Sequence, residues 1–457
     1  MVEDPVVIEV VLGFCDAASV ARFARSSRSS LRSADTVARR AMEKVGMRGS
    51  ALEGLGYLEV RGQRTLGVAG HAVVGAGAWV AYTCGSGRYG QLGVGSVMDS
   101  SKVQRATRLP GPVFCAGAGA RFSAFVVGAG VAYACGDGSS GALGSATAPC
   151  SSCTRPRPVP ELARTRVRTV SCGASHTLWV INEDRGVVGM GSNKNGELGV
   201  GDRKDRAVPT AVRTADGVRL VGASDVAAGV NHSLCACAGG LYSWGAANKG
   251  QLGHADSHAR VFADRVETTS WVARRVAAGG MFSLVLDADG ALHACGDARS
   301  GALGLSRTGR LLKCTRFQPL SSMSGVILDV SAGYAHAVAI ASPGVLYAWG
   351  GGYKGHAAAL GLGDTSLGCD TPRLVYLGDD DAPVAVAAGG TTDVGTTLVR
   401  MRSGAVLAAG GGLVVPPVSS FRELLPAAVA AAGVAEAKRF GPRDDSSAQS
   451  YYFAGIF

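Results

Sequence analysis

The decapeptide CGSGRYGQLG, residues 84–93, decides the fold because it returns about every fifty residues. Its further copies are CGDGSSGALG from Cys135, MGSNKNGELG from Met190, WGAANKGQLG from Trp244 and CGDARSGALG from Cys295. A sixth copy begins at Trp349 as WGGGYKG and reaches Leu360-Gly361 only after an insertion, and a seventh is reduced to Ala409-Gly410. A period of this length is typical of a repeat architecture.

A second motif precedes each decapeptide and gives the same count. Its copies are AGARFS at Ala118, CGASHT at Cys172, AGVNHS at Ala228, AGGMFS at Ala278, AGYAHA at Ala332 and AGGTTD at Ala388, with a shortened AGH at Ala69. The two motif series together predict seven units.

Short apolar stretches lie between the motifs, for example residues 233–237 and 241–244. Stretches of this length, bounded by glycine turns, predict buried strands joined in a hairpin. Each unit is then a small antiparallel sheet that cannot bury its faces alone, and a ring of such sheets is a β-propeller. The sequence therefore predicts an all-β fold, a seven-bladed β-propeller.

Two glycines recur inside each decapeptide, where we expect turns with positive φ or a close approach of another backbone. We expect a structural role for these glycines and for the recurring histidines of the second motif, which are Gly85, Gly90, Gly136, Gly141, Gly191, Gly196, Gly245, Gly250, Gly296, Gly301, His176, His232 and His336. For the histidines we expect hydrogen bonds to turn backbone rather than a shared metal or catalytic site. Phe122 and Phe282 occupy the same position, which a catalytic or ligand role would not tolerate.

The motif pair resembles the regulator of chromosome condensation repeat family, whose units carry AGxxH, a hairpin and then WGxNxxGQLG. The resemblance covers residues 58–416 and implies a β-propeller of seven blades. One branch of the family implies chromatin binding and nucleotide exchange on a Ran-type small GTPase. Another branch, the plant ultraviolet-B photoreceptors, uses tryptophans in GWRHT motifs. The equivalents here, GASHT, GVNHS, GGMFS and GYAHA, contain none, so we do not expect ultraviolet sensing by that route.

Residues 1–50 differ from the repeats because their apolar residues fall at helical spacing, as in the series from Leu31 to Val45. This segment predicts a small α-helical module. It resembles the F-box, although Asp4 stands where that family has a leucine. The resemblance implies a Skp-type adaptor as partner. The adaptor-binding residues expected in that case are Pro5, Val6, Ile8, Val11, Leu12, Phe14, Val20 and Phe23.

The last segment, residues 417–457, ends in a strand-like stretch from Ser446 to Phe457 that is either a ring-closing strand or a tail. No apolar run of the sequence approaches the roughly twenty residues of a membrane helix. The amino terminus also lacks the features of a signal peptide, so we expect an intracellular protein of the cytoplasm or nucleus. The twelve cysteines follow the repeat positions, as buried small residues do, and predict neither disulfides nor a metal site.

The formal net charge of +10 is unevenly spread. Basic residues gather in three segments at the same stage of successive repeats, namely Arg155, Arg157, Arg164, Arg166 and Arg168, then Arg203, Lys204 and Arg206, and then Arg307, Arg310, Lys313 and Arg316. We expect them on one face or rim of the ring. There they either bind an acidic protein surface or nucleic acid, or only keep the linkers soluble.

Catalytic and nucleotide-binding motifs are missing from the sequence, and it predicts no cofactor. We expect a non-enzymatic receptor whose amino-terminal module docks a Skp-type adaptor of a cullin ubiquitin ligase, while the propeller captures a client protein. The alternatives are regulation of a small GTPase by the propeller and a plain interaction scaffold.

Overall fold

The computed structural model describes residues 81–425 except residues 112, 145–151, 269, 307–311, 354, 364–367, 379–380 and 412–417. The chain divides into two compact units, residues 1–66 and 67–457, and every described residue belongs to the second. The expected F-box-like module and the strand-like stretch at residues 446–457 lie outside the described residues.

The described residues form six four-stranded antiparallel sheets, each built from four strands that follow one another in sequence. We call each sheet a blade. The first three blades are β3 (Val113–Ala118), β4 (Phe122–Val127), β5 (Val131–Gly136) and β6 (Cys153–Pro158); β7 (Val167–Cys172), β8 (His176–Ile181), β9 (Val187–Gly191) and β10 (Arg206–Ala211); and β11 (Ala223–Ala228), β12 (His232–Cys237), β13 (Gly240–Gly245) and β14 (Arg260–Arg265).

The other three are β15 (Ala273–Ala278), β16 (Phe282–Asp287), β17 (Leu292–Asp297) and β18 (Lys313–Pro319); β19 (Ile327–Ala332), β20 (His336–Ala341), β21 (Val345–Gly350) and β22 (Cys369–Val375); and β23 (Pro383–Gly390), β24 (Gly395–Met401), β25 (Val406–Gly410) and β26 (Val418–Leu425). Two short 3-10 helices, η1 (Pro160–Leu162) and η2 (Ala357–Leu360), interrupt the described loops. The all-β fold predicted from the sequence is confirmed.

The predicted number of blades is wrong. The first repeat contributes a two-stranded sheet of β1 (Tyr82–Gly85) and β2 (Ser100–Arg105), so the described chain has six blades and not seven. Counting motifs overestimates the number of blades because a decapeptide specifies only the turn between the last two strands of a blade. A complete blade also needs its first two strands, and the shortened motif at Ala69 lies outside the described residues.

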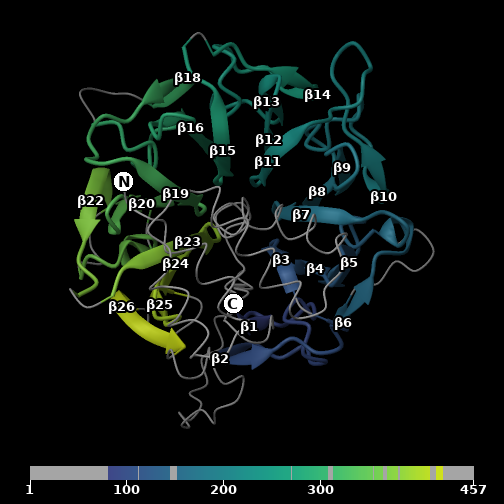
Figure 1. Cartoon of the computed structure of the whole chain (residues 1–457), viewed down its shortest axis with the longest axis horizontal. Helices are drawn as coiled ribbons and strands as arrows, with labels where there is room; N and C mark the ends of the chain where they lie inside the picture. Colours follow the sequence, from purple (N-terminus) through teal and green to yellow (C-terminus); the bar gives the residue numbers. More distant parts are fainter. Residues whose placement is uncertain are drawn as a thin grey trace, which may run out of the picture. The chain divides into compact units, whose positions relative to one another are not determined.

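The blades follow one another around a centre, with β3, β7, β11, β15, β19 and β23 innermost and the fourth strand of each blade at the rim (Figure 1). Consecutive innermost strands contact each other. Apolar side chains fill the space between neighbouring blades, as where Phe282 and Leu284 pack with Ala337 and Trp349. The core is therefore a series of layers between sheets, as expected when repeats bury one another.

An innermost strand is a sheet edge, and edges expose backbone N–H groups unless something covers them. Here side chains of the preceding blade accept these N–H groups. The Ser171 hydroxyl accepts from Ala228 N at 3.0 Å, and the Ser331 hydroxyl accepts from Ala388 N at 2.9 Å. The centre of the ring is thereby held by hydrogen bonds between blades as well as by apolar packing.

The two ends of each blade differ. At one end lie the turn between the first two strands and the decapeptide turn, which are joined by backbone hydrogen bonds such as Ala246 N to Asn231 O at 2.8 Å. We call this end of the blades the loop face. At the opposite end, the hairpin face, lie the hairpins between second and third strands and the linkers that lead from one blade to the next.

Candidate interaction face

The recurring histidines join neighbouring blades beneath the loop face. His176 Nε2 lies 3.1 Å from Ser233 Oγ of the next blade, and His232 Nε2 lies 3.0 Å from Ser283 Oγ. His336 contacts Thr397 Oγ1 in the same way at 3.0 Å. Turn backbone, the partner expected from the sequence, contributes at His232 and His336 through Phe282 and Thr396, and a hydroxyl of the next blade bonds the Nε2 atom of each ring.

The serine hydroxyls fix the histidine tautomer. Ser233 donates its own proton to Glu197 O at 2.7 Å, so its oxygen can only accept from His176 Nε2–H. The Nδ1 atom is then unprotonated, and it has no hydrogen-bond partner among the described residues. Burial lowers the pKa of His176 to about 3 and that of His232 to about 4, because a second proton on Nδ1 would have no acceptor. These histidines are neutral structural groups at neutral pH.

The decapeptide glycines bring backbones together. Gly245 has φ +97°, and a Cβ there would lie 2.6 Å from Asn231 O of the neighbouring turn. Gly250 has φ +79°, and a Cβ there would lie 2.6 Å from Cys314 O on the outer strand of the next blade. All ten glycines named from the sequence have positive φ. The decapeptide turn therefore connects its own blade to the rim of the next one.

A buried ion pair joins the innermost strands of two neighbouring blades. Arg275 Nη1 lies 2.6 Å from Asp329 Oδ1, and both side chains are almost completely buried. Asp225 occupies the position of Arg275 in the blade before it, and its Oδ2 atom accepts a hydrogen bond from Val276 N at 3.0 Å. Burial raises the pKa of both carboxyl groups, with that of Asp225 raised further. These charges are enclosed between blades and belong to the scaffold rather than to a binding surface.

Above this scaffold, the decapeptide turns present charged and aromatic side chains on the loop face. The fifth and sixth positions of the decapeptide hold Arg88, Tyr89, Lys194, Asn248, Lys249, Arg299 and Tyr353. Arg121, from a neighbouring turn, lies over the Tyr89 ring with 4.6 Å to its centroid. Arg88 pairs with Asp99 at 3.3 Å, whereas Lys194 and Lys249 have no ion pair within the part of the chain that the structure describes.

One group on this face, which we call the Tyr–Arg cluster, consists of Arg299, Tyr334 and Tyr353 around the carboxyl group of Asp297. Arg299 Nε lies 2.9 Å from Asp297 Oδ1 and 3.0 Å from Oδ2. Although burial opposes ionisation of Asp297, hydrogen bonds from Arg299 lower its pKa. Burial and the nearby Asp297 charge raise the pKa of Tyr334 and Tyr353, so both hydroxyls stay protonated. The cluster joins two adjacent blades.

The basic residues expected in one band do not gather at one place. Those at the rim, on the outer strands or in the loops that lead into them, are Arg155, Arg157, Arg203, Lys204, Arg206, Lys313 and Arg316. Those at the hairpin-face end, before or at the start of β7, are Arg164, Arg166 and Arg168. Arg307 and Arg310 lie outside the described residues, as do the eight adaptor-binding residues expected in the F-box-like module.

The rim residues occupy edge strands, which natural sheets protect with charged residues and prolines. Strand β6 combines Arg155 and Arg157 with two prolines, and β10 carries Arg206 and Pro209. Arg206 is also paired with Asp202 at 2.6 Å. Protection of the rim against pairing with other strands accounts for these positions without any partner.

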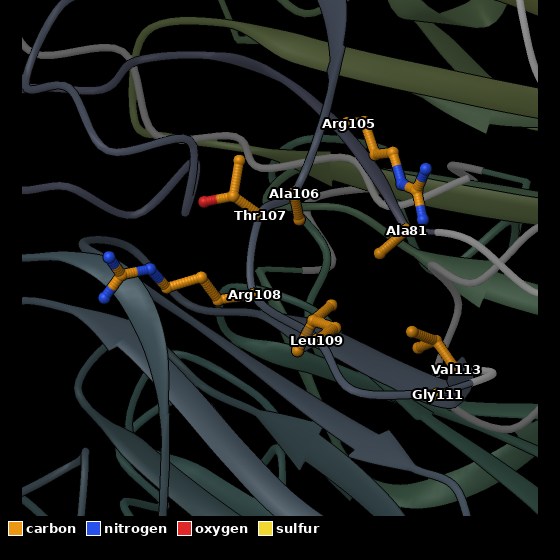
Figure 2. Close-up of a pocket in the computed structure, with 8 residues that line it drawn as sticks. All are labelled: Ala81, Arg105, Ala106, Thr107, Arg108, Leu109, Gly111 and Val113. Atoms are coloured by element: carbon orange, nitrogen blue, oxygen red, sulfur yellow. The ribbon is translucent and has the colours of Figure 1, made fainter.

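A cavity of about 290 Å³ lies between the two-stranded sheet and β3. Its lining includes Arg105, Thr107, Arg108 and Leu109, and the two guanidinium groups point in different directions (Figure 2). Polar groups therefore do not converge on it as in a typical ligand site. Among the residues that the structure describes, no cluster of side chains could hold a metal ion, and no helix is long and apolar enough to span a membrane.

Sequence reasoning missed the loop-face side chains because it treated the decapeptide only as a structural motif. The signal was present inside the motif. Its second and seventh positions hold glycine in every intact copy, whereas the fifth position changes from Arg88 to Ser139, Lys194, Asn248 and Arg299. Variation between fixed glycines indicates side chains that the scaffold does not need.

The fold and its loop face define a β-propeller that carries surface loops on a repeated scaffold. The model of the RCC1-like domain matches residues 80–412, and the chain belongs to this family. The ultraviolet-B receptor UVR8 of Arabidopsis thaliana is 31% identical over 325 residues, which cover 70% of this chain and 71% of the relative. Human E3 ubiquitin-protein ligase HERC2 is 31% identical over 263 residues, which cover 56% of this chain but only 5% of that much longer protein.

Solved structures share the fold at lower identity. Human WBSCR16 superposes with a TM-score of 0.66 at 19% identity and covers 76% of this chain and 95% of that one. Yeast RCC1 (Prp20), solved bound to Kap60, has a TM-score of 0.52 at 18% identity and covers 77% and 92%. At these identities the likeness concerns the fold alone.

Proposed function

We propose that this protein is a non-enzymatic interaction receptor that captures a client protein on the loop face of its propeller. The observation that carries the proposal is the combination of a scaffold fixed by interblade hydrogen bonds with charged and aromatic side chains held above it. Such surfaces on a rigid frame are suited to partner recognition. Membership of the RCC1-like family supports the same general role.

The proposal assigns residues 1–50 to docking on a Skp-type adaptor of a cullin ubiquitin ligase, through apolar side chains that include Leu12 and Phe14. The match to part of human HERC2, a protein named as an E3 ubiquitin-protein ligase, supports a propeller of this family within ubiquitin transfer. In this arrangement the chain recruits a client and supplies no catalytic residue.

A pull-down of purified adaptor by the full chain tests the docking. We expect binding by the natural chain and loss of binding by the double variant Leu12→Asp, Phe14→Asp, since a few buried apolar anchors dominate a helix-in-groove interface. The matched control is Ser29→Asp, Ser30→Asp, which adds the same charge to the same segment. Equal retention by all three proteins contradicts the adaptor assignment.

Regulation of a small GTPase by the propeller is the alternative. It predicts that the full chain accelerates release of labelled nucleotide from a Ran-type GTPase. Acceleration together with no adaptor binding would replace the receptor proposal, whereas no acceleration across a panel of small GTPases would remove the alternative.

A further inference from the structure

The Tyr–Arg cluster differs from the rest of the loop face because its side chains are held in place before any partner arrives. The Arg299 side chain is 44% exposed, yet Asp297 fixes its guanidinium group through both carboxylate oxygens. Asp297 itself is 5% exposed at its side chain, so it orients the arginine and offers little surface of its own. A partner that contacts Arg299 meets a side chain whose rotamer is already chosen, which lowers the entropic cost of binding.

The two tyrosines are held in a similar way. A Cβ placed on Gly280 would lie 3.1 Å from the Tyr334 ring, so that ring packs against the neighbouring blade where only glycine fits. On the other side, the His356 ring is 5.8 Å from Tyr334 and 6.4 Å from Tyr353, measured between centroids. The buried His356 thus lies beside both rings. Partly exposed, immobilised tyrosines beside an arginine have the composition of an interface hot spot.

Charge is unevenly distributed around the cluster. Asp393, on the blade that follows the two tyrosines, adds to burial in raising the pKa of Tyr334, whereas the two blades that precede them carry Arg299 and Lys249, and this side favours a negative group. Lys249, on the adjacent blade, lies close enough to Asp297 to lower the pKa of that carboxyl group further. Asp297 is already neutralised by Arg299, so Lys249 adds an uncompensated positive charge at the border of the cluster. Lys194, one blade further, also has no ion pair within the described ranges.

We infer that the Tyr–Arg cluster is the energetic centre of an interface for an acidic protein segment that carries an apolar or aromatic anchor residue. The anchor packs on Tyr334 and Tyr353, and the flanking carboxylates contact Arg299 and Lys249. This inference rests on the proposed role of the loop face as the client surface. It does not depend on the adaptor assignment of residues 1–50.

Two fluorescein-labelled glutamate-rich peptides, one with a central tryptophan and one with glycine in its place, test the inference by fluorescence anisotropy with the full chain at low salt. We expect the tryptophan peptide to bind the natural protein more tightly than the glycine peptide. Lys249→Glu should weaken both peptides by about tenfold, which corresponds to about 1.4 kcal/mol. Tyr334→Ala should abolish the difference between the peptides, because it removes the surface on which the anchor packs.

The matched control is Arg157→Glu, which makes the same change in net charge on the exposed rim strand β6. We expect it to change either affinity by less than about twofold. Equal weakening by Arg157→Glu and Lys249→Glu would overturn the inference, since net charge alone would then explain binding. Retention of the tryptophan preference in Tyr334→Ala would overturn it as well.

A labelled single-stranded DNA distinguishes the other class of anionic partner. If the DNA binds more tightly than both peptides and loses affinity in Lys249→Glu, the surface serves nucleic acid and the inference is overturned. The adaptor pull-down tests residues 1–50 separately. Absence of peptide binding can therefore be distinguished from absence of adaptor binding. Circular dichroism melts of each variant confirm that the propeller is folded.

Discussion

The hydrogen bond between His232 and Ser283 provides a quantitative test of how neighbouring blades are held together. Both side chains are completely buried, and His232 Nε2–H donates to Ser283 Oγ at 3.0 Å. The serine in turn donates to Gln251 O at 2.7 Å. Ser283→Ala leaves the histidine donor buried without an acceptor, which costs about 2 kcal/mol of unfolding free energy. The Gln251 carbonyl keeps a contact from the Cys295 thiol at 3.5 Å, so it adds little to that cost.

The chain itself shows how the same position works without the bond. Phe282 replaces the histidine one blade later, and the residue that faces it in the following blade is Ala337, so the donor and its acceptor are absent together. The double variant His232→Phe, Ser283→Ala copies this pair. We expect it to cost about 1 kcal/mol, whereas the two single variants sum to about 3 kcal/mol. The coupling energy of the cycle is then about 2 kcal/mol.

Urea unfolding of the full chain, followed by tryptophan fluorescence, measures the four free energies. The buried Trp244 lies on β13, beside β12, which carries His232, so unfolding of this blade contributes to the signal together with the other tryptophans. If the free-energy losses of the two single variants add up to that of the double variant within about 0.5 kcal/mol, the assignment of this contact as a hydrogen bond between blades is refuted.

The variant His232→Phe also leads to a prediction about how stability depends on pH. Burial lowers the pKa of His232 from about 6.5 to about 4, so the unfolded chain binds the proton first as the pH falls. Stability due to this group is therefore fully present above about pH 6.5, is lost as the pH falls, and stops falling below about pH 4. His232→Phe should make the loss of stability shallower by up to about 1.4 kcal/mol per pH unit in that window. An unchanged pH dependence would mean that the histidine is not buried in its neutral form.

Further variants test the backbone contacts and the buried charges. Gly250→Ala should lower the free energy of unfolding by about 3 kcal/mol, because its Cβ would meet a backbone carbonyl of the next blade. Gly128 also has positive φ but has open space around it, so Gly128→Ala should cost about 1 kcal/mol. Equal urea midpoints for the two variants would contradict this difference. Asp329→Asn should cost about 3 kcal/mol since it leaves Arg275 buried without its counter-charge. Asp225→Asn should cost less than about 1 kcal/mol, because an amide oxygen can still accept the backbone hydrogen bond from Val276; a larger loss than for Asp329→Asn would contradict the order.

The repeat pattern predicted the inner strands well because glycines mark the turns that join them, as between β12 and β13. Residues 233–237 and 241–244, expected as a hairpin, are found in β12 and β13. The number of blades could not be predicted in this way. A motif marks a turn, but a blade depends on pairing between strands whose partners are far apart in the sequence, as Leu346 and Val375 are, and the turn residues do not specify this pairing.

The hydrogen-bond partners of the histidines could not be predicted from the sequence for a related reason. His176 and Ser233 are separated by 57 residues, and nothing local connects them. Comparison of corresponding positions in successive repeats gives only a partial signal, since Phe282 is followed by Ala337 and the histidines by serine or threonine, but Phe122 is followed by Thr177. The basic residues illustrate the opposite case. Their spacing suggested one band, but the strands distribute them between the rim and the opposite end of the blades.

These observations separate the residues that fix the ring from those that can recognise a partner. Glycines at the second and seventh positions of the decapeptide are held by positive φ and close backbone contacts, so their replacement disturbs two blades at once. The fifth position points away from those contacts and holds Arg88, Lys194, Asn248 and Arg299 on equivalent turns. Substitutions of Arg88, Lys194 or Asn248 alter the loop face with little effect on stability, as is usual for exposed positions outside special backbone geometry, whereas Arg299 also neutralises the buried Asp297. A scaffold of this kind can therefore acquire a new partner by changes in the same turns that hold its blades together, because within one decapeptide the two tasks fall on different residues.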